Sequence, residues 1–260
     1  MNTENLAFDA HIHLTDNEYS GYLQFLLNTL RSLKINSCSV TVNIETCIRS
    51  LNLFGNETKD IVTQFLGIHP EYANQDIEGF ENLLKQNVSI IDGIGEIGID
   101  PSYQSRNGVS YDRQKFVFNT MLGFAEKYGK PVSIHSRNSV DDVLDIVRTH
   151  RLKGALLHWF SGSAEQLKRA MDMGLYVSYG PSLVYSKVMK ESFLNADRDL
   201  ILVETDGPVR YYRCFDNLIS MSSSFLISVI NSAAYLLKIP FHQVTEQLRS
   251  NSERFLGRSL

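Results

Sequence analysis

The sequence predicts one α/β domain over residues 1–260, a single (β/α)8 TIM barrel in which parallel strands alternate with helices. Eight short apolar runs rich in β-branched residues follow one another, and most are separated by segments with the apolar spacing of helices. Five of the seven histidines stand where such a run ends. Because this barrel carries its functional groups at the C-terminal ends of its strands, the predicted fold and the histidine positions support each other.

The predicted strands follow in order, without a linker, repeat or low-complexity tract between them. They cover residues 6–11, 35–43, 65–69, 88–96, 131–135, 154–158, 175–179 and 200–206. Two of the intervening helices have specific signals. Apolar residues recur at helical spacing over residues 117–128, and Ser163 with Gln166 forms a capping box before a helix that stops at Gly174.

Bulk composition restricts the classes of function. The formal net charge of −4 argues against broad adhesion to a nucleic-acid backbone, although bound divalent ions would make a local site positive. No apolar run approaches the roughly 20 residues of a membrane span, and residues 1–5 lack a signal-peptide pattern, so we expect a cytoplasmic protein. The three cysteines are widely spaced, which indicates neither a disulfide framework nor a thiolate zinc site.

The first candidate metal ligands are His11 and His13. Successive side chains of a strand point to opposite faces, so two histidines two positions apart project from one face and can bind one cation. Asp9 shares that parity. Such a pair alone is weak evidence, and its weight comes from the other strand ends.

Glu96 is the predicted centre of the site. It lies among Gly93, Gly95 and Gly98, which permit close backbone approach and unusual dihedral angles. A carboxylate has two oxygens and can bridge two cations, whereas an imidazole offers one lone pair to one ion. The alternative is a solvated acid at a turn.

His135 and His158 end consecutive predicted strands and are candidate ligands of a second ion. Singly, each would more simply be a satisfied core histidine. Asp206 ends the last strand, beside the first strand of a closed barrel, where it could complete the first site and accept a proton from an activated water. Glu204 has the same parity and could support the site from below or be a buried acid held by other partners.

The residues named above resemble the TatD-type metal-dependent hydrolases, the TatD DNase family within the amidohydrolase-like barrels. The matching motifs span nearly the whole chain: residues 8–14, 67–70, 95–100, Gln114, 135–137, 158–163, 204–208, and Asn251 with Phe255. The resemblance implies two ions, with magnesium, manganese or zinc as candidates. His11, His13, Glu96 and Asp206 would hold one of them. Glu96, His135 and His158 would hold the other, and His69 and Arg137 would lie in the substrate-binding rim.

The chain departs from that family pattern around the substrate. Glu71 stands where a second histidine is common, and Trp159 replaces a residue that is usually small. Residues 209–217 lack the common Arg-Asn-Glu-Pro stretch but carry Arg210, Arg213 and three aromatics. These arginines could hold phosphate, and the aromatics and Trp159 could stack on bases. The alternative is an ordinary loop whose aromatics pack against neighbouring helices.

The sequence therefore predicts a divergent TatD-like deoxyribonuclease that uses two metal ions to cleave phosphodiester bonds at single-stranded DNA ends. Glu96 and Asp206 are its catalytic candidates, with Asp206 as general base. Two alternatives stay open. One is an amidase or esterase acting on a small substrate or an aminoacyl ester, and the other is a non-catalytic binding module. The fold alone does not choose among them.

Overall fold

Eight parallel strands form one sheet in the order β1 to β8 in the computed structural model, which describes residues 6–216, 218–219 and 222–260. Their bounds are β1 (Ala7–Ile12), β2 (Ile35–Val40), β3 (Val62–Leu66), β4 (Gly93–Gly98), β5 (Val132–His135), β6 (Ala155–Leu157), β7 (Tyr176–Tyr179) and β8 (Ile201–Val203). The register pairs Ser37 with Val62 and Ile97 with Ile134. The predicted (β/α)8 barrel is confirmed.

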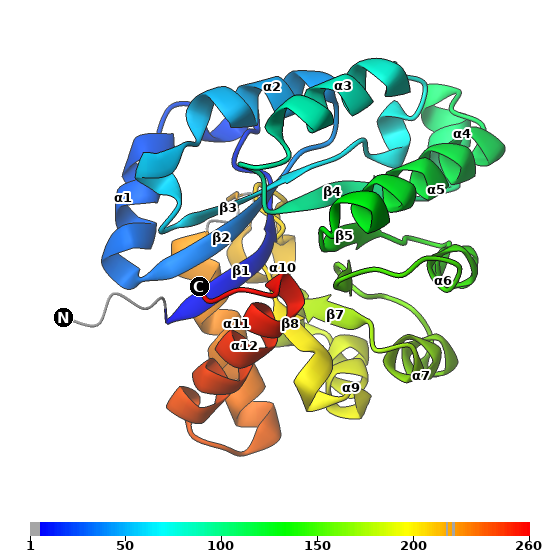
Figure 1. Cartoon of the computed structure of the whole chain (residues 1–260). Helices are drawn as coiled ribbons and strands as arrows, with labels where there is room; N and C mark the ends of the chain where they lie inside the picture. The colour runs from blue at the N-terminus through cyan, green and yellow to red at the C-terminus, as the bar shows by residue number, and fades with distance from the viewer. Residues whose placement is uncertain (1–5, 217, 220–221) are drawn as a thin grey trace.

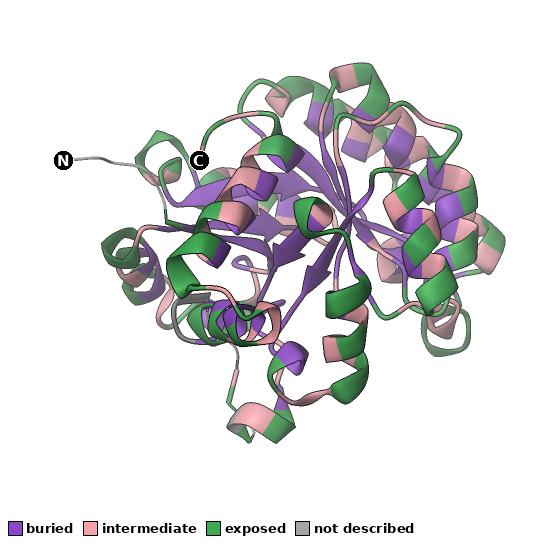
Figure 2. Cartoon of the chain, turned by 90° about the horizontal axis from the view of Figure 1, so that it is seen from below, coloured by how far each residue is buried: buried purple, intermediate pink, exposed green. Residues whose placement is uncertain are grey.

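Helices surround the strands on the outside (Figure 1). They are α1 (Leu23–Leu33), α2 (Ile44–Leu53), α3 (Ile77–Asn87), α4 (Ser102–Asn107), α5 (Tyr111–Tyr128), α6 (Val140–Val147), α7 (Ala164–Asp172), α8 (Ser182–Tyr185), α9 (Lys187–Asn195), α10 (Tyr212–Phe215), α11 (Ser222–Leu237) and α12 (Phe241–Leu256). Four short 3-10 helices also occur: η1 (Asn17–Tyr19), η2 (Asn56–Thr58), η3 (Pro70–Tyr72) and η4 (Arg198–Leu200). Figure 2 shows buried strands at the centre and helices with exposed outward faces.

The two helices with sequence signals form as predicted. The α5 helix begins after Ser110, whose side chain accepts the backbone N–H of Arg113, and buries Val117 and Met121. The α7 helix has the predicted capping box between Ser163 and Gln166 and ends before Gly174. Its first turn thus satisfies backbone donors that a helix otherwise leaves unpaired.

Every strand differs from its predicted bounds by at least one residue, and β2, β3, β4 and β8 differ by more. The β2 strand ends at Val40 rather than at residue 43, β3 ends at Leu66, so that His69 lies beyond it, and β4 continues past Glu96 to Gly98. The β3 strand begins at Val62, and β8 ends at Val203, so Glu204 to Asp206 lie beyond the strand. The β4 strand begins only at Gly93. Residues 88–92 do not start it because Val88 keeps helical dihedral angles at the end of α3, and the N–H groups of Ile90 and Ile91 donate to Asn87 O.

Backbone contacts join the last strand to the first and close the barrel at its C-terminal end. The N–H of Asp206 donates to His11 O (2.9 Å), and the N–H of His13 donates to Gly207 O (2.8 Å). The backbone N–H and the hydroxyl of Thr205 both donate to the Asp9 carboxylate, at 2.8 and 2.6 Å. Residues far apart in the sequence are therefore fixed side by side.

The opposite end of the barrel is filled by the last helix. Phe255 of α12 packs against Phe65 and Tyr176, with ring centroids 6.1 and 5.4 Å away. Gly154 admits this helix, since a Cβ there would lie 2.4 Å from Phe255 O. The N-terminal end is thus a packed core, and the open end is the one that carries the histidines.

No single helix in the described ranges is long and apolar enough to cross a membrane. Residues Phe225–Leu237 and Phe241–Leu256 meet that length and composition only as a pair, and the pair is bent by 110°.

A substitution at Gly98 tests how closely β4 and β5 approach each other near the C-terminal end of the barrel. Its φ is +149°, and a Cβ would lie 2.0 Å from His135 O, so Gly98→Ala combines backbone strain with a clash. We expect a loss of about 1–3 kcal/mol or more in the free energy of unfolding, measured in urea. Gly123→Ala is the control, because a Cβ there meets nothing within 4 Å and alanine favours helix by about 1 kcal/mol. An unchanged unfolding curve for Gly98→Ala would contradict this packing.

Candidate active site

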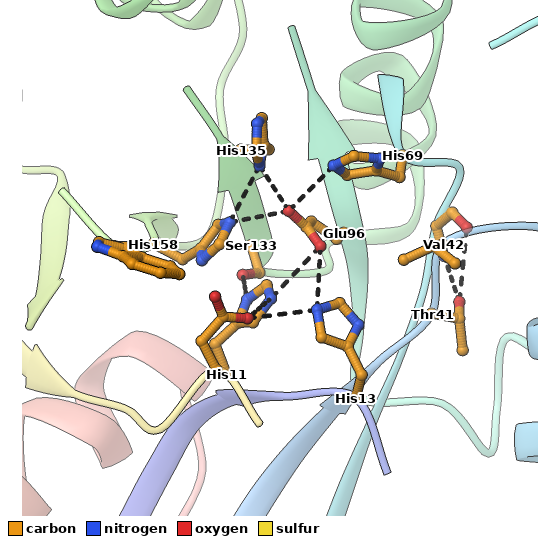
Figure 3. A network of polar contacts seen from close by, with 12 residues as sticks. His11, His13, Thr41, Val42, His69, Glu96, Ser133, His135 and His158 are labelled. Carbon is orange, nitrogen blue, oxygen red and sulfur yellow. Dashed lines mark hydrogen bonds and ion pairs between the residues drawn. The ribbon is translucent and has the colours of Figure 1, made fainter. Parts of the chain in front are cut away.

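The Glu96 carboxylate stands at the centre of the C-terminal end of the barrel (Figure 3). Its Oε1 lies 2.8 Å from His158 Nε2, 2.9 Å from His135 Nδ1 and 3.5 Å from His69 Nε2. The nitrogens of His135 and His158 that face Oε1 are themselves 3.4 Å apart. One carboxylate oxygen therefore shares a small volume with two imidazole nitrogens.

The other carboxylate oxygen of Glu96 faces the end of β1. Glu96 Oε2 lies 3.4 Å from His11 Nε2 and 3.5 Å from His13 Nε2. Asp206 Oδ1 approaches the same two nitrogens, at 3.7 and 3.4 Å. The structure thus brings all six predicted metal ligands together, in two groups that share Glu96.

Strand ends place these side chains. His135 is the last residue of β5, and His158 directly follows β6. Asp206, with φ +49°, lies in the turn after β8, and the N–H of Glu96 is fixed by Thr41 O at 2.8 Å. Gly95 allows β4 to lie close to β5, since a Cβ there would stand 2.9 Å from Ser133 Cβ.

Neighbouring polar groups orient the imidazoles. Ser133 Oγ lies 2.8 Å from His11 Nδ1, and Asp100 Oδ2 lies 3.1 Å from His135 Nε2. Each contact occupies one ring nitrogen and leaves the other facing Glu96, which is how protein imidazoles are usually prepared for a metal. No role for Ser133 or Asp100 was predicted from the sequence. A polar residue within an apolar strand, such as Ser133, was the available signal.

His69 is oriented differently. Its Nδ1 accepts the backbone N–H of Glu71 at 3.3 Å, at the start of η3. Burial lowers the pKa of His69 to about 3, so the ring is neutral at neutral pH and its proton resides on Nε2. Although His69 lies near Glu96 and His135, an N–H has no lone pair for a cation. In this tautomer the Nε2–H of His69 faces Glu96 Oε1, 3.5 Å away, at the wall of the cavity.

Charges in the site favour an added positive charge. Burial acts to raise the pKa of Glu96, but the surrounding imidazoles outweigh it and hold that pKa well below its usual range. Burial acts to lower the pKa of His158, but Glu96 and Glu204 outweigh it and raise it well above its usual value. The carboxylates thus stabilise any cation placed among these rings.

Two features fit divalent metal ions. Buried His11 Nε2 has no hydrogen-bond partner among the described residues, although it faces two carboxylates. Two clusters that share His11, one with Glu96 and His158 and the other with His13 and Asp206, have ligand atoms within 4.8 Å of one another. Imidazole nitrogen and carboxylate oxygen suit zinc and manganese, and one carboxylate can serve two ions. The arrangement is that of a binuclear centre.

The family of TatD related DNases matches residues 8–257 of the chain. The chain belongs to this TatD family. It is 25% identical over 258 residues to YabD of Bacillus subtilis, an uncharacterized metal-dependent hydrolase, with 96% of this chain and 98% of that protein covered. It is 26% identical over 210 residues to the 3'-5' ssDNA/RNA exonuclease TatD of Edwardsiella piscicida, covering 77% and 78%.

A solved TatD homologue, YjjV of Escherichia coli, has the same fold. Its TM-score is 0.84 at 22% identity, with 96% of this chain and 97% of that chain covered. The sequence-based assignment to the TatD family is therefore correct, and the protein is a metal-dependent hydrolase of that family.

Above the histidines lies a cavity of about 860 Å³. Four of the predicted substrate-binding residues line it: His69, Arg137, Trp159 and Arg210. Arg213 is not among its lining residues, and its guanidinium lies 5.8 Å from the ring centre of Tyr185. The roles of these five residues in binding stay predictions.

The loop after β8 has features of both predicted alternatives, an ordinary packed loop and a substrate-binding loop. Tyr211 is buried, donates its hydroxyl to Thr205 O at 3.1 Å and packs 5.5 Å from the Trp159 ring, so it supports the loop as a core residue. Tyr212 is exposed, and the side chain of Phe215 lies outside the described part. Arg210 reaches the cavity but forms a two-pronged ion pair with Glu18.

Asp100 provides a test of the metal-binding arrangement. Asp100→Asn removes the charge that orients His135, so we expect about 10–100-fold weaker binding of Mn²⁺ to EDTA-treated protein, measured by calorimetry. Asp76→Asn makes the same change at the exposed cap of α3 and should leave Mn²⁺ affinity unchanged. Equal affinities in the two variants would show that Asp100 does not support a ligand.

Proposed function

We propose that the protein is a two-metal phosphodiesterase that removes nucleotides from the end of single-stranded DNA. One observation carries the proposal: the two oxygens of Glu96 face different imidazoles. Oε1 faces His69, His135 and His158, and Oε2 faces His11 and His13, with Asp206 beside the second group. In-line displacement at phosphorus uses two cations a few ångströms apart, and a bridging carboxylate is suited to hold that spacing. The ssDNA/RNA exonuclease among the relatives supports the substrate class.

The proposed ligands follow the two groups in the structure. His11, His13, Glu96 and Asp206 would hold one divalent ion, and Glu96, His135 and His158 the other. When bound, such ions neutralise charge on the phosphoryl oxygens and make water more acidic. Magnesium, manganese and zinc are the candidates.

Asp206 is the proposed general base. It lines the cavity, and one of its oxygens lies 3.4 Å from His13 Nε2, so a water held beside that imidazole is within reach of the carboxylate. The carboxylate would take a proton from the water as the water attacks phosphorus and the P–O bond to the neighbouring nucleotide breaks, and the departing oxygen takes up a proton from solvent. The backbone bond from Asp206 N to His11 O keeps this acid in place relative to β1.

His69 and Arg137 are proposed to bind the phosphate. His69 presents a neutral Nε2–H to the cavity, which can donate to a phosphoryl oxygen without adding charge. Arg137 is exposed at the rim and has no ion pair with another described residue. Its guanidinium is therefore available for two parallel hydrogen bonds to phosphate.

The rim supports attack at an end rather than within a long strand. Asp16, Glu18 and Glu71 line the cavity, and Glu18 already neutralises Arg210. A long polyanion needs a basic track, which these acids interrupt. A cavity of about 860 Å³ lies within the range of small-ligand sites and suits a terminal nucleotide.

The same acidic rim favours a second candidate, hydrolysis of a small ester or amide with no polyanion. A screen of single-stranded DNA, duplex DNA, RNA, small phosphodiesters and amino-acid esters, with each metal supplied separately, separates the two. We expect the highest kcat/KM on single-stranded DNA. Turnover confined to the esters would overturn the nuclease proposal while leaving the metal centre in place.

Asp206→Asn tests the general base. The amide is close in shape but a poor proton acceptor, so we expect kcat to fall by about 10²–10⁴-fold with an unchanged circular dichroism spectrum. Asp16→Asn, in the same cavity but at the rim, should keep kcat within a few-fold. Near-normal turnover by Asp206→Asn would assign the base elsewhere.

Glu18→Gln tests whether Arg210 is held back from the substrate. Freeing the guanidinium should tighten binding of a single-stranded oligonucleotide roughly two- to fivefold and steepen its salt dependence by about one ion. Fluorescence anisotropy at several salt concentrations measures both. Glu57→Gln removes an exposed acid before β3, at the other end of the barrel, and should change neither. Weaker binding by Glu18→Gln would show that the ion pair itself forms the binding surface.

A further inference from the structure

We propose a second binding site, for a phosphate-bearing anion, in a pocket at the N-terminal end of the barrel. The pocket encloses about 390 Å³ and is lined by residues that precede β3, β4, β5 and β6, together with the end of the chain after α12. The residues of the active site all lie at or beyond the C-terminal ends of the strands. The pocket is therefore separate from the site of hydrolysis and does not depend on the proposed function.

The lining of this pocket is strongly basic. Lys59, Lys130, Lys153 and Arg258 line it, and Asp92 is its one carboxylate. The chain as a whole has a net charge of −4, so this excess of positive charge is local.

The single carboxylate of the pocket, that of Asp92, already has partners on both of its oxygens. Asp92 Oδ1 pairs with Arg258 Nε at 3.2 Å, and Asp92 Oδ2 accepts the backbone N–H of Gln64 at 2.9 Å. Lys59 and Lys153 have no hydrogen bond or ion pair with another described residue. Three ammonium groups thus surround a hollow without a counter-charge to match them.

Packing holds part of this basic lining in place. Lys153 crosses the backbone at Gly257, where a Cβ would lie 2.2 Å from Lys153 Cε. Lys130 Nζ donates to Ile91 O at 2.6 Å, and Arg258 donates from Nη2 to Thr63 Oγ1 at 2.9 Å. Burial lowers the pKa of Lys130, and the nearby charge of Lys153 lowers it further against the opposing effect of Asp92. Two cations this close are stabilised by an anion between them.

The chemistry of the pocket selects a phosphate group. Ammonium groups donate to several acceptors at once, and a phosphate offers at least three oxygens in a compact, doubly charged unit. The volume is near the lower limit for small-ligand sites, which suits inorganic phosphate or a nucleoside monophosphate. Ile90 and Tyr128 add an apolar wall that a nucleoside could contact.

Binding here has a predictable physical effect. The ligand would connect the loops before four strands with the segment after α12, and the unfolded chain has no such arrangement of lysines. An anion that binds only the folded state raises the melting temperature by mass action. A site at this end of the barrel would therefore stabilise the fold, at a distance from the reacting atoms.

The experiment uses the full chain after treatment with EDTA, so that phosphate cannot bind through metal ions. Inorganic phosphate and AMP are titrated separately, with sodium chloride at matched ionic strength, and binding is followed by calorimetry and thermal unfolding. We expect saturable binding of one anion per chain and a rise in melting temperature of about 2–4 °C per kcal/mol of binding. If AMP binds at least tenfold more tightly than phosphate, the site is a nucleotide site. If the two bind with equal affinity, the site recognises phosphate itself.

Two double variants decide whether this pocket is responsible. Lys59→Met with Lys153→Met removes two exposed, unpaired amines and should weaken anion binding at least tenfold without lowering the melting temperature in chloride alone. Lys168→Met with Lys187→Met removes the same charge from exposed lysines of α7 and α9, outside the pocket, and should bind like the original chain. No saturable binding beyond chloride, or equal affinity in both double variants, would overturn the proposal.

Discussion

The position of one carboxylate, Glu96, determines how the functional end of this barrel is organised. A buried carboxylate is costly unless its charge is compensated, and here the nearby compensating groups are five imidazoles from four strand ends. Because its two oxygens face opposite sides, the acid divides the histidines into two groups. A single side chain would therefore connect the two ions of a binuclear centre.

That arrangement depends on how the strands approach one another. Gly95 and Gly98 let β4 run unusually close to β5, which brings Glu96 beside His135. The contacts of Asp206 and Thr205 with β1 close the barrel on the other side. Backbone geometry, as well as the identity of the ligands, therefore determines how the candidate metal ligands of this TatD-family hydrolase are arranged. The rim, in contrast, is made mostly of side chains from the loops and helices that follow the strands.

Strand positions and ligand candidates could be predicted from the sequence because both follow short-range rules. Apolar runs marked all eight strands, and the histidines and acids at their ends pointed to one end of a barrel. The beginning of β4 could not be predicted, because Val88 has high strand propensity and only the continuation of α3 overrides it. The pairing of Arg210 with Glu18 was equally hidden, since it joins loops 192 residues apart. Likewise, only the contact with Glu71 N shows which nitrogen of His69 carries the proton.

Anomalous X-ray scattering from crystals loaded with manganese is the most direct test of whether Glu96 bridges two metal ions. We expect two peaks on opposite sides of Glu96, each about 2.0–2.3 Å from one of its oxygens. One should be ligated also by His11, His13 and Asp206, and the other by His135 and His158, with His69 coordinating neither. A single peak, or two peaks that do not share Glu96, would show that Glu96 does not bridge two ions.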